Sequence, residues 1–338
     1  MKTIVLEEPG RFHLAETPAP STPGPGEALV RVHRVGVCGT DLHAFRGKQP
    51  FFTYPRVVGH ELGVEIVTLA GHDSHLTAGD RCAVEPYLHC GRCIACRRGK
   101  TNCCVRLQVL GVHTDGGMRD FLTVPVAKLH KSDRLSLDQL ALVEMLSIGA
   151  HAVRRAQLES GEAVLVIGAG PIGLSVIRCA QLVGARVIVL EVSERRRAFC
   201  LTQLQVAGCL DGKGDSIRAL EGLLQGDLPT AVFDATGNAP SMMKAPQYVA
   251  HGGKLVLVGL VQADLSFHDP DLHRRELTLL RSRNATGSDF AWVIQMLEEG
   301  HIDLTPWITH RAPAEKMIPE FPSWLDPDRG VIKAVVEF

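Results

Sequence analysis

The stretch that decides the fold of this chain covers residues 163–173, Ala163-Val164-Leu165-Val166-Ile167-Gly168-Ala169-Gly170-Pro171-Ile172-Gly173. Its five leading apolar residues are typical of a strand that is buried on both faces of a parallel sheet. The glycines behind them match G-x-G-x-x-G, and an apolar segment with helical spacing follows. This order of strand, glycine turn and helix predicts the first unit of a dinucleotide-binding fold.

Each glycine of the turn has its own physical task. Gly168 permits the tight turn, Gly170 lets the backbone approach a pyrophosphate, and Gly173 lets helix and strand pack closely. The helix amides after the turn face the anion. We assign the following residues to cofactor binding: Gly168, Gly170, Pro171, Ile172 and Gly173 in the turn, and Thr236 and Val258 near the ends of later strands.

The strand that follows the turn ends in Glu191, 18 positions after Gly173. A carboxylate there accepts both ribose hydroxyls of NAD and repels the 2′-phosphate of NADP. The three arginines at 195–197 leave an alternative open, because they can hold a 2′-phosphate, stack on adenine or form a solvated helix face. We favour NAD, and we add Glu191 and Arg196 to the cofactor-binding residues.

Apolar strands continue to alternate with helices downstream, at 186–190, 231–234 and 253–258. This alternation predicts a doubly wound parallel sheet, an α/β Rossmann domain over residues 146–285. Residues 4–128 instead show short Val- and Ile-rich runs between Gly and Pro, which indicates an all-β region. A helix from about Ser136 joins the two regions. A helix at 289–299 and a strand at 330–338 are too little to fold alone, so 286–338 should dock onto 1–145.

Composition narrows the function classes. The chain has 338 residues, 36 Lys and Arg against 37 Asp and Glu, and a net charge of -1. Such a balance gives no general attraction to nucleic acid or to an anionic membrane. The apolar run at the start is too short for a signal peptide, and no stretch is apolar enough for a bilayer span. We therefore expect a cytoplasmic protein that partners neither nucleic acid nor membrane.

Cysteine spacing indicates a closed metal site. Cys90, Cys93, Cys96 and Cys104 follow the pattern C-x2-C-x2-C-x7-C on a loop rich in Gly and basic residues. Four thiolates on one short loop suit tetrahedral structural zinc. An iron-sulfur cluster uses the same ligands, and simple core cysteines are the other alternative, but nothing else in the chain implies electron transfer. Cys103 is a substitute for Cys104 as the fourth ligand.

A second set of donors is dispersed along the chain. It consists of Cys38 with Thr40 and His43 close behind it, of His60-Glu61, and of Glu144. Each residue alone is unremarkable, since a lone Cys or His is usually a core residue or a satisfied polar group. Together, thiolate, imidazole and carboxylate suit zinc with an open coordination position.

These residues resemble the zinc-dependent medium-chain dehydrogenase/reductase superfamily over essentially the whole chain. The shared features, in family order, are the stretch 37–43, Gly59-His60-Glu61, the four-cysteine segment and the Rossmann glycines. Glu144, within Leu142-Val143-Glu144-Met145-Leu146-Ser147, resembles the polyol and threonine dehydrogenase branch, where this glutamate lies at the metal. The stretches 49–61 and 282–286 are similar to the bacterial galactonate oxidoreductase group.

The resemblance implies a GroES-like β-rich catalytic domain, residues 1–145 and 286–338, around an inserted NAD-binding domain. It implies hydride transfer to NAD from a secondary alcohol of a sugar acid or polyol at a zinc held by Cys38 and His60. It places Thr40 against the zinc-bound oxygen and His43 on the path of the proton, although a turn hydroxyl and a surface histidine are their ordinary alternatives. A homo-oligomer, dimer or tetramer, is also implied.

Two departures from the family pattern bear on the third ligand. Gly63 comes one position early, with Val64 in the usual glycine place, and Met145 replaces a proline common after the metal-site glutamate. Glu61 and Glu144 therefore stay open as alternatives. Arg283 and Asn284 are candidates for the substrate, with a guanidinium available to a carboxylate, but they suit the cofactor or another subunit equally.

Other functions remain as rivals. These are a threonine or sorbitol-type dehydrogenase, a zinc-independent NAD(P)H reductase and a nonenzymatic NAD-binding protein. The full set of metal donors opposes the last two.

Overall fold

The computed structural model describes residues 1–71 and 75–338 and divides into two compact units. One unit comprises Met1–Met145 and Ala285–Phe338, and the other comprises Leu146–Asn284. Helix α3 (Leu137–Ala156) spans the division. Its start is capped reciprocally, because the Gln139 amide donates to the Ser136 hydroxyl at 3.2 Å while the Ser136 amide donates to the Gln139 side chain at 2.9 Å.

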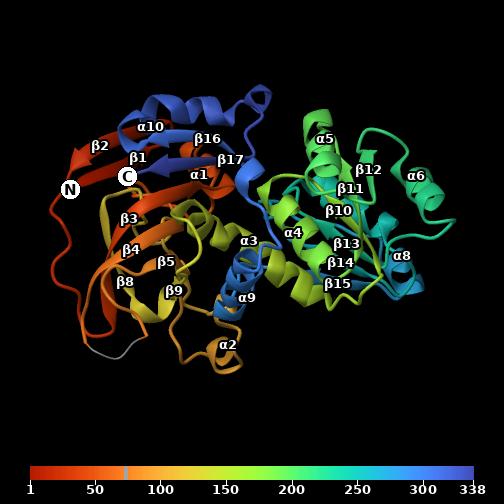
Figure 1. Ribbon diagram of the computed structural model, residues 1–338. Helices are drawn as coiled ribbons and strands as arrows, with labels where there is room; N and C mark the ends of the chain where they lie inside the picture. The colour runs from red at the N-terminus through yellow and green to blue at the C-terminus, as the bar shows by residue number, and fades with distance from the viewer. Residues whose placement is uncertain (72–74) are drawn as a thin grey trace. The chain divides into compact units, whose positions relative to one another are not determined.

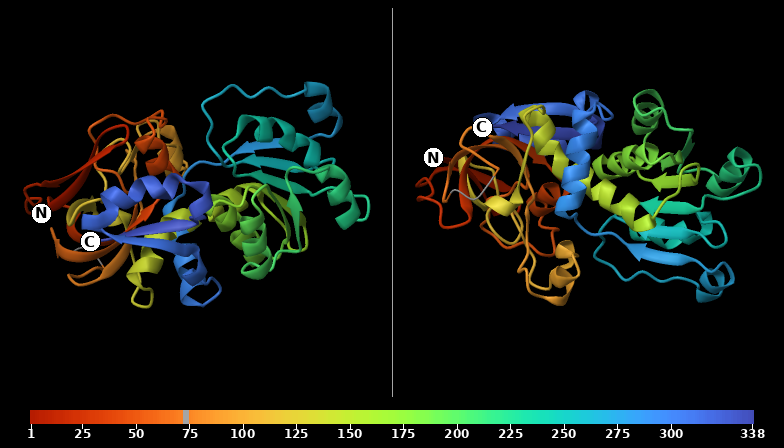
Figure 2. Two further views of the ribbon diagram at one scale, coloured as in Figure 1. Left: turned by 90° about the horizontal axis from the view of Figure 1, so that it is seen from above. Right: turned by 60° about the horizontal axis from the view of Figure 1, so that its bottom comes forward.

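The second unit is built on a six-stranded sheet in the order β12-β11-β10-β13-β14-β15. All five pairings are parallel, which confirms the doubly wound α/β prediction (Figures 1 and 2). The expected bounds of β10 and β13 agree with the structure residue for residue. Each strand is one short apolar run, so the ends of the run indicate the ends of the strand. The strands are β10 (Ala163–Ile167), β11 (Arg186–Glu191), β12 (Gly208–Asp211), β13 (Ala231–Asp234), β14 (Lys254–Leu257) and β15 (Thr278–Arg281).

Five helices lie between these strands: α4 (Pro171–Leu182), α5 (Glu194–Thr202), α6 (Ser216–Leu223), α7 (Ala239–Lys244) and α8 (Asp269–Arg274). Strand register fixes where the functional loops meet. In β10, Ile167 lies opposite both Leu190 of β11 and Asp234 of β13. The loops that follow Ile167, Glu191 and Asp234 therefore leave the same edge of the sheet, where α/β folds bind their ligands.

The first unit contains a seven-stranded sheet with the path β16-β17-β3-β4-β5-β9, on which β8 also pairs with β3. The final strand β17 runs antiparallel to β3 with Val336 opposite Val35, so the end of the chain pairs with a strand of the first region (Figure 1). The strands are β3 (Glu27–Val37), β4 (Glu61–Leu69), β5 (Arg81–Val84), β8 (Phe121–Pro125), β9 (Leu129–Lys131), β16 (Ile308–Pro313) and β17 (Lys333–Glu337).

Among the described residues of this unit there are also two small sheets and four further α-helices. The sheets pair β1 (Lys2–Glu8) with β2 (Arg11–Glu16), and β6 (Tyr87–Leu88) with β7 (Gln108–Val109). The helices are α1 (Gly39–Phe45), α2 (Ile94–Arg97), α9 (Gly287–Glu298) and α10 (Ala314–Glu320). The prediction of an all-β region over 4–128 was thus wrong at α1 and α2. Both are too short, at 7 and 4 residues, to show a helical apolar repeat.

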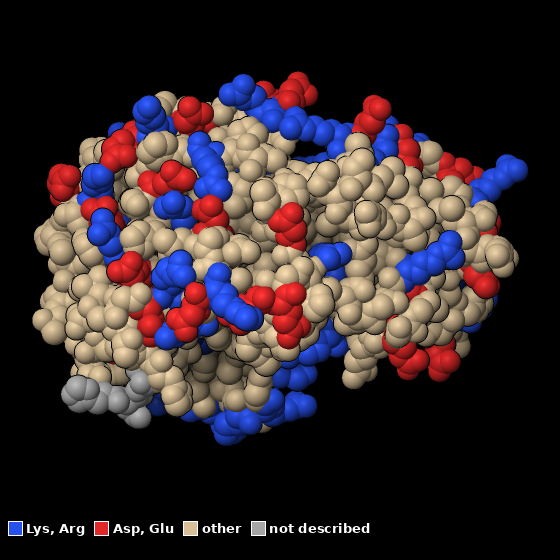
Figure 3. Space-filling model, viewed as in Figure 1, with Lys and Arg blue, Asp and Glu red and all other residues tan. Residues whose placement is uncertain are grey.

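Charge is mixed on the face of the protein that Figure 3 shows. On the face seen in Figure 3, basic and acidic side chains lie interspersed, as the near-zero net charge leads one to expect. Within the described residues, no helix is both long and apolar enough to span a bilayer.

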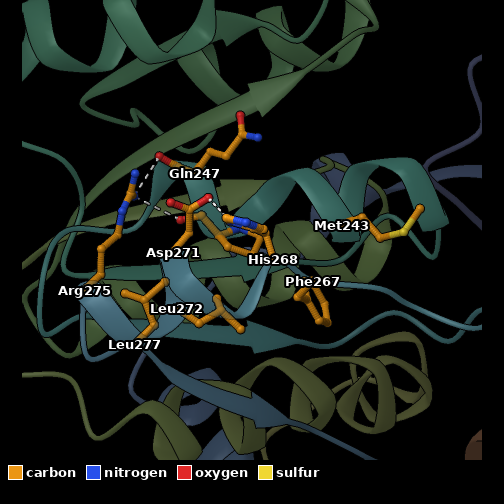
Figure 4. A pocket seen from close by; sticks show the side chains of 9 residues that line it. Met243, Gln247, Phe267, His268, Asp271, Leu272, Arg275 and Leu277 are labelled. Atoms are coloured by element: carbon orange, nitrogen blue, oxygen red, sulfur yellow. Dashed lines mark hydrogen bonds and ion pairs between the residues drawn. The ribbon is translucent and has the colours of Figure 1, made fainter.

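The second unit has a small cavity of about 60 Å³ beside α8 (Figure 4). Arg275 stiffens its wall by donating to the carbonyl oxygens of Pro246, Gln247 and Val249, at 3.1 to 3.3 Å. His268 and Asp271 pair at 3.0 Å on the same rim. These contacts join α8 and the residue after it to the segment that follows α7, and none of the lining residues belongs to the glycine turn.

Candidate functional site

The first unit brings three dispersed donors together. The Cys38 sulfur, a His60 ring nitrogen and a Glu61 carboxylate oxygen lie within 4.8 Å of one another. Cys38 immediately precedes α1, and its amide donates to the Asp41 carboxylate at 2.9 Å, so the helix start fixes the cysteine. Glu61 is the first residue of β4, which pairs with β3, and His60 directly precedes it. Two adjacent strands and one helix start therefore define the group.

The chemistry of this group fits a metal ion. His60 is 5% exposed, and burial alone would lower the pKa of its imidazole, but the charges of Asp41 and Cys38 raise that pKa well above its usual value. Nδ1 of His60 and Oδ1 of Asp41 lie 3.8 Å apart, and each is buried without a hydrogen-bond partner. A cation among the three donors would balance this negative surrounding, and Asp41 would then orient the imidazole.

Glu61 has a buried cationic partner. Lys333 of β17 donates to both carboxylate oxygens, each at 2.7 Å, and to the Val37 carbonyl at 3.1 Å. Glu61 is 0% exposed and Lys333 is 1% exposed. Gly36 leaves the room for this pair, since a Cβ there would lie 2.1 Å from a Glu61 oxygen. The signal for Lys333 was missed because a single lysine in a terminal strand reads as an ordinary surface residue.

Glu144 lies in α3, outside the group of three donors. Its carboxylate accepts a hydrogen bond from the Tyr87 hydroxyl. Burial raises the pKa of Glu144 to about 6, with the Glu61 charge acting in the same direction and His60 and Tyr87 against it. The two glutamates that the sequence left as alternatives are thus held by different partners, a lysine and a tyrosine.

Thr40 and His43 both belong to α1, three residues apart and hence on one face of the helix. Thr40 is half-buried, and His43 is more exposed but still partly covered. Burial, and then the charges of Arg46 and Lys48, lower the pKa of the His43 imidazole. The pair therefore leads from the partly buried start of α1 to the surface.

The four predicted cysteines form the other candidate metal group among the described residues. Sulfur atoms of Cys90, Cys93, Cys96 and Cys104 lie within 4.8 Å of one another, whereas Cys103 is exposed and outside the group. The Arg92 and Cys93 amides lower the pKa of the Cys90 thiol to about 5. The Cys90 and Arg106 amides donate to the Cys104 sulfur at 3.3 and 3.4 Å. Amides facing sulfur stabilise thiolates, the form that binds zinc.

The second unit carries the glycine turn between β10 and α4. Gly168 has φ +90°, a conformation that side chains disfavour. A Cβ on Gly173 would lie only 1.8 Å from the Gly168 carbonyl oxygen, so close packing of helix and strand needs this glycine. Pro171 is the first residue of α4 and Ile172 the second. Gly170 precedes them as the cap, with an Arg196 nitrogen 3.8 Å from its ideal Cβ position.

Glu191 ends β11 and is tied to the turn. Its carboxylate accepts the Ala169 amide at 2.6 Å and the Ser193 amide at 2.8 Å. Arg197 donates to the Glu191 carbonyl at 2.8 Å and pairs with Asp211. Of the arginines of α5, Arg197 thus binds the strand end, while Arg196 lies near Gly170 of the turn. The two carboxylate oxygens of Glu191 thus lie beside the glycine turn of residues 168–173.

Thr236 and Val258 follow β13 and β14 at the same sheet edge. A Cβ on Gly168 would contact the Thr236 methyl at 3.0 Å. The fully buried Asp234 accepts from the Thr236 amide and hydroxyl at 2.9 and 2.6 Å, and the Val258 amide donates to the Asp234 carbonyl at 2.9 Å. Asp234 therefore organises both loops, a role that the sequence reading did not assign to it.

The two substrate candidates follow β15. Arg283 is exposed, and Asn284 has φ +52° with its side-chain nitrogen buried. Asparagine tolerates this left-handed conformation better than most residues.

With this geometry in place, comparison with known proteins defines the class. The Alcohol dehydrogenase GroES-like domain model matches residues 24–134, and the Zinc-binding dehydrogenase model matches residues 171–299. The chain belongs to the zinc-binding alcohol dehydrogenase family.

Individual relatives agree with that assignment. The chain is 42% identical to the L-galactonate-5-dehydrogenase of Escherichia coli (strain K12), an alignment that covers 100% of this chain and 99% of the relative. The Escherichia coli CFT073 short chain alcohol dehydrogenase rspB, solved with NADH, matches with a TM-score of 0.93 at 28% identity, over 100% and 99% of the two chains. A zinc-binding dehydrogenase from Sinorhizobium meliloti 1021, solved with NADP, matches at 0.91 and 27% identity, again over 100% and 99%.

Proposed function

We propose that this protein is an NAD-dependent dehydrogenase that oxidises a secondary alcohol of a sugar acid or polyol, with an L-galactonate-like molecule as the leading substrate. The observation that carries the proposal is the convergence of Cys38, His60 and Glu61 in a zinc-binding dehydrogenase chain. The substrate class rests on the 42% identity to the L-galactonate-5-dehydrogenase over the full chain.

Cys38, His60 and Glu61 hold the catalytic zinc in this proposal. The Glu144 charge acts on His60 from outside that group. When bound, zinc supplies Lewis acidity that lowers the pKa of an alcohol. Cys90, Cys93, Cys96 and Cys104 hold the structural zinc.

Two residues of α1 act on the proton of the substrate hydroxyl. Thr40 hydrogen-bonds the reacting hydroxyl, and His43 relays the released proton outward, since the lowered pKa keeps its imidazole neutral and able to accept. Arg283 and Asn284 serve as substrate contacts, with the guanidinium available to a substrate carboxylate.

NAD binds at the glycine turn of residues 146–285. Gly168, Gly170, Pro171, Ile172 and Gly173 receive the pyrophosphate. Glu191 accepts the ribose hydroxyls, and Arg196, Thr236 and Val258 line the cofactor. The catalytic domain comprises residues 1–145 and 286–338.

We also propose a cytoplasmic homo-oligomer. Strand β15 is an edge of the six-stranded sheet, and its Leu279 is 45% exposed, so its backbone offers a template for pairing with a second copy. Light scattering after gel filtration measures the assembly, and a monomer at working concentration would contradict this part.

The test is NAD reduction by metal-replete protein over a panel of aldonates, hexuronate-derived acids, polyols, sorbitol and threonine. L-Galactonate or a close aldonate should give the highest kcat/KM, and Cys38→Ser should abolish turnover. A strong response to threonine or sorbitol without one to sugar acids would assign the protein to the other branch. Turnover that survives chelation would favour the zinc-independent reductase, and no turnover with any substrate a nonenzymatic role.

A further inference from the structure

We propose that Tyr87 is a positioning residue that keeps the Glu144 carboxylate out of the catalytic metal's ligand set, so that Cys38, His60 and Glu61 supply the protein ligands and one position stays open. The inference rests on the proposed metal site. It assigns a role to a residue that stands 57 positions from its partner and belongs to neither metal group.

The first step is the fixed direction of the tyrosine. Tyr87 is 2% exposed and lies in β6, where it pairs with Val109 of β7. Its ring meets the Phe290 ring edge-on, with centroids 6.3 Å apart and planes at 80°. Phe290 is itself fully buried and stacked on His130 at 5.0 Å. Backbone pairing and ring packing thus hold the phenol in one orientation.

The second step is the hold on Glu144. The Tyr87 hydroxyl donates to Glu144 Oε1, and the glutamate is 5% exposed, so no water competes freely for that bond. A hydrogen bond to a charged carboxylate is stronger than one between neutral groups, and this bond must be given up before the carboxylate turns toward another partner.

The third step is the contrast with Glu61. Lys333 neutralises Glu61 yet leaves it within the group of three donors, whereas Glu144 lies outside that group. One thiolate, one imidazole and one carboxylate already make the three protein ligands of an open catalytic zinc site. A fourth protein ligand, Glu144, would close the position that a substrate hydroxyl needs.

The test is Tyr87→Phe, which keeps the ring and its packing and removes the hydroxyl. We expect the freed Glu144 to join the metal, so zinc affinity at this site rises roughly tenfold or more while kcat falls. Zinc affinity is measured by competition with a chromogenic chelator. The zinc that the Cys38→Ser protein still binds is subtracted, so that only zinc at the Cys38 site is counted. Cobalt substitution gives a second readout, since the visible spectrum should change as a carboxylate enters the coordination sphere.

Two controls isolate the effect. In the Glu144→Gln background, Tyr87→Phe should change neither affinity nor spectrum, because the carboxylate is already gone. Tyr54→Phe removes a tyrosine hydroxyl that donates to the Ala44 carbonyl in the same unit and should leave zinc affinity unchanged.

Weaker zinc binding in Tyr87→Phe would overturn the inference, because it would mean that the tyrosine supports ligation by Glu144. Unchanged affinity and spectrum would overturn it as well, since the hydroxyl would then be purely structural. Failure of the proposed function looks different: wild-type protein would then bind no metal that depends on Cys38.

Discussion

Lys333 and Glu61 form a buried ion pair across 272 positions of sequence, with the ammonium 2.7 Å from each carboxylate oxygen. Both side chains are almost fully withdrawn from solvent, at 1% and 0% exposure. Since the lysine also donates to the Val37 carbonyl directly before Cys38, one cation links the last strand to Glu61 and to the residue that precedes Cys38, two of the three proposed metal ligands being Glu61 and Cys38.

Replacing this lysine should therefore cost more than an ordinary salt bridge. Lys333→Met leaves the Glu61 charge buried and unpaired, so we expect the metal-free protein to lose about 3 to 5 kcal/mol of unfolding free energy. Bound zinc should reduce the loss, because a second cation then faces Glu61. Urea unfolding with and without a chelator measures both. Lys2→Met, which breaks the exposed Lys2–Glu315 pair, is the matched control and should change the unfolding free energy far less, because water screens this pair.

Substitution of the adjacent residues Cys103 and Cys104 should affect zinc content differently. Cys104 is buried in the four-sulfur group, whereas Cys103 is exposed outside it. Cys104→Ser should lower zinc content from about two to about one per chain and destabilise the loop, because binding energy at such sites stabilises the fold. Cys103→Ser should keep both metals. Elemental analysis with thermal unfolding decides, and metal loss from Cys103→Ser alone would reverse the ligand assignment.

Much of this architecture could be predicted from the sequence. Strand β10 and the glycine turn were recognisable because a doubly buried strand and G-x-G-x-x-G are local signals. The four cysteines were recognisable because their spacing is short. Helix α1 was missed because its 7 residues are set by the capping contact of Cys38 with Asp41 rather than by an apolar repeat.

The partners of the two glutamates could not be predicted. Lys333 and Tyr87 reach Glu61 and Glu144 only through tertiary pairing, of β17 with β3 and of β6 with β7. Neither residue lies in a motif, so these two contacts become visible only in the folded structure.

Cofactor preference gives the third prediction. The Glu191 carboxylate is held toward the glycine turn by the Ala169 and Ser193 amides. Glu191→Ala removes the acceptor for the ribose hydroxyls and the repulsion of a 2′-phosphate, so the kcat/KM ratio of NADP to NAD should rise by roughly tenfold to a hundredfold. Arg196→Ala, made in the Glu191→Ala protein, removes the cation beside Gly170 and should lower the NADP to NAD ratio of kcat/KM again in part. An unchanged ratio in Glu191→Ala would remove the glutamate from the ribose site.

Acid sensitivity of the first unit should depend on Asp138. This carboxylate accepts from Arg311 at 2.7 and 3.1 Å and from Arg34 at 3.0 Å, and it is 27% exposed. Burial alone would raise the pKa of Asp138, but the hydrogen bond and charge of Arg311, and then Arg34, lower it below the usual 3.8. A lowered folded pKa means stability that is present above the unfolded value and is lost as the pH falls through the folded one.

Asp138→Asn should therefore destabilise the protein by about 1 kcal/mol near neutral pH, and the difference from wild type should shrink below about pH 4. Urea unfolding at a series of pH values measures this difference. Asp271→Asn is the control. The pKa of Asp271 is also lowered, but its side chain is 56% exposed. Water screens its pairs with His268 and Arg274 there, so this substitution should change stability less. A difference for Asp138→Asn that is constant with pH would mean that the arginines stabilise the fold through packing and not through this charge.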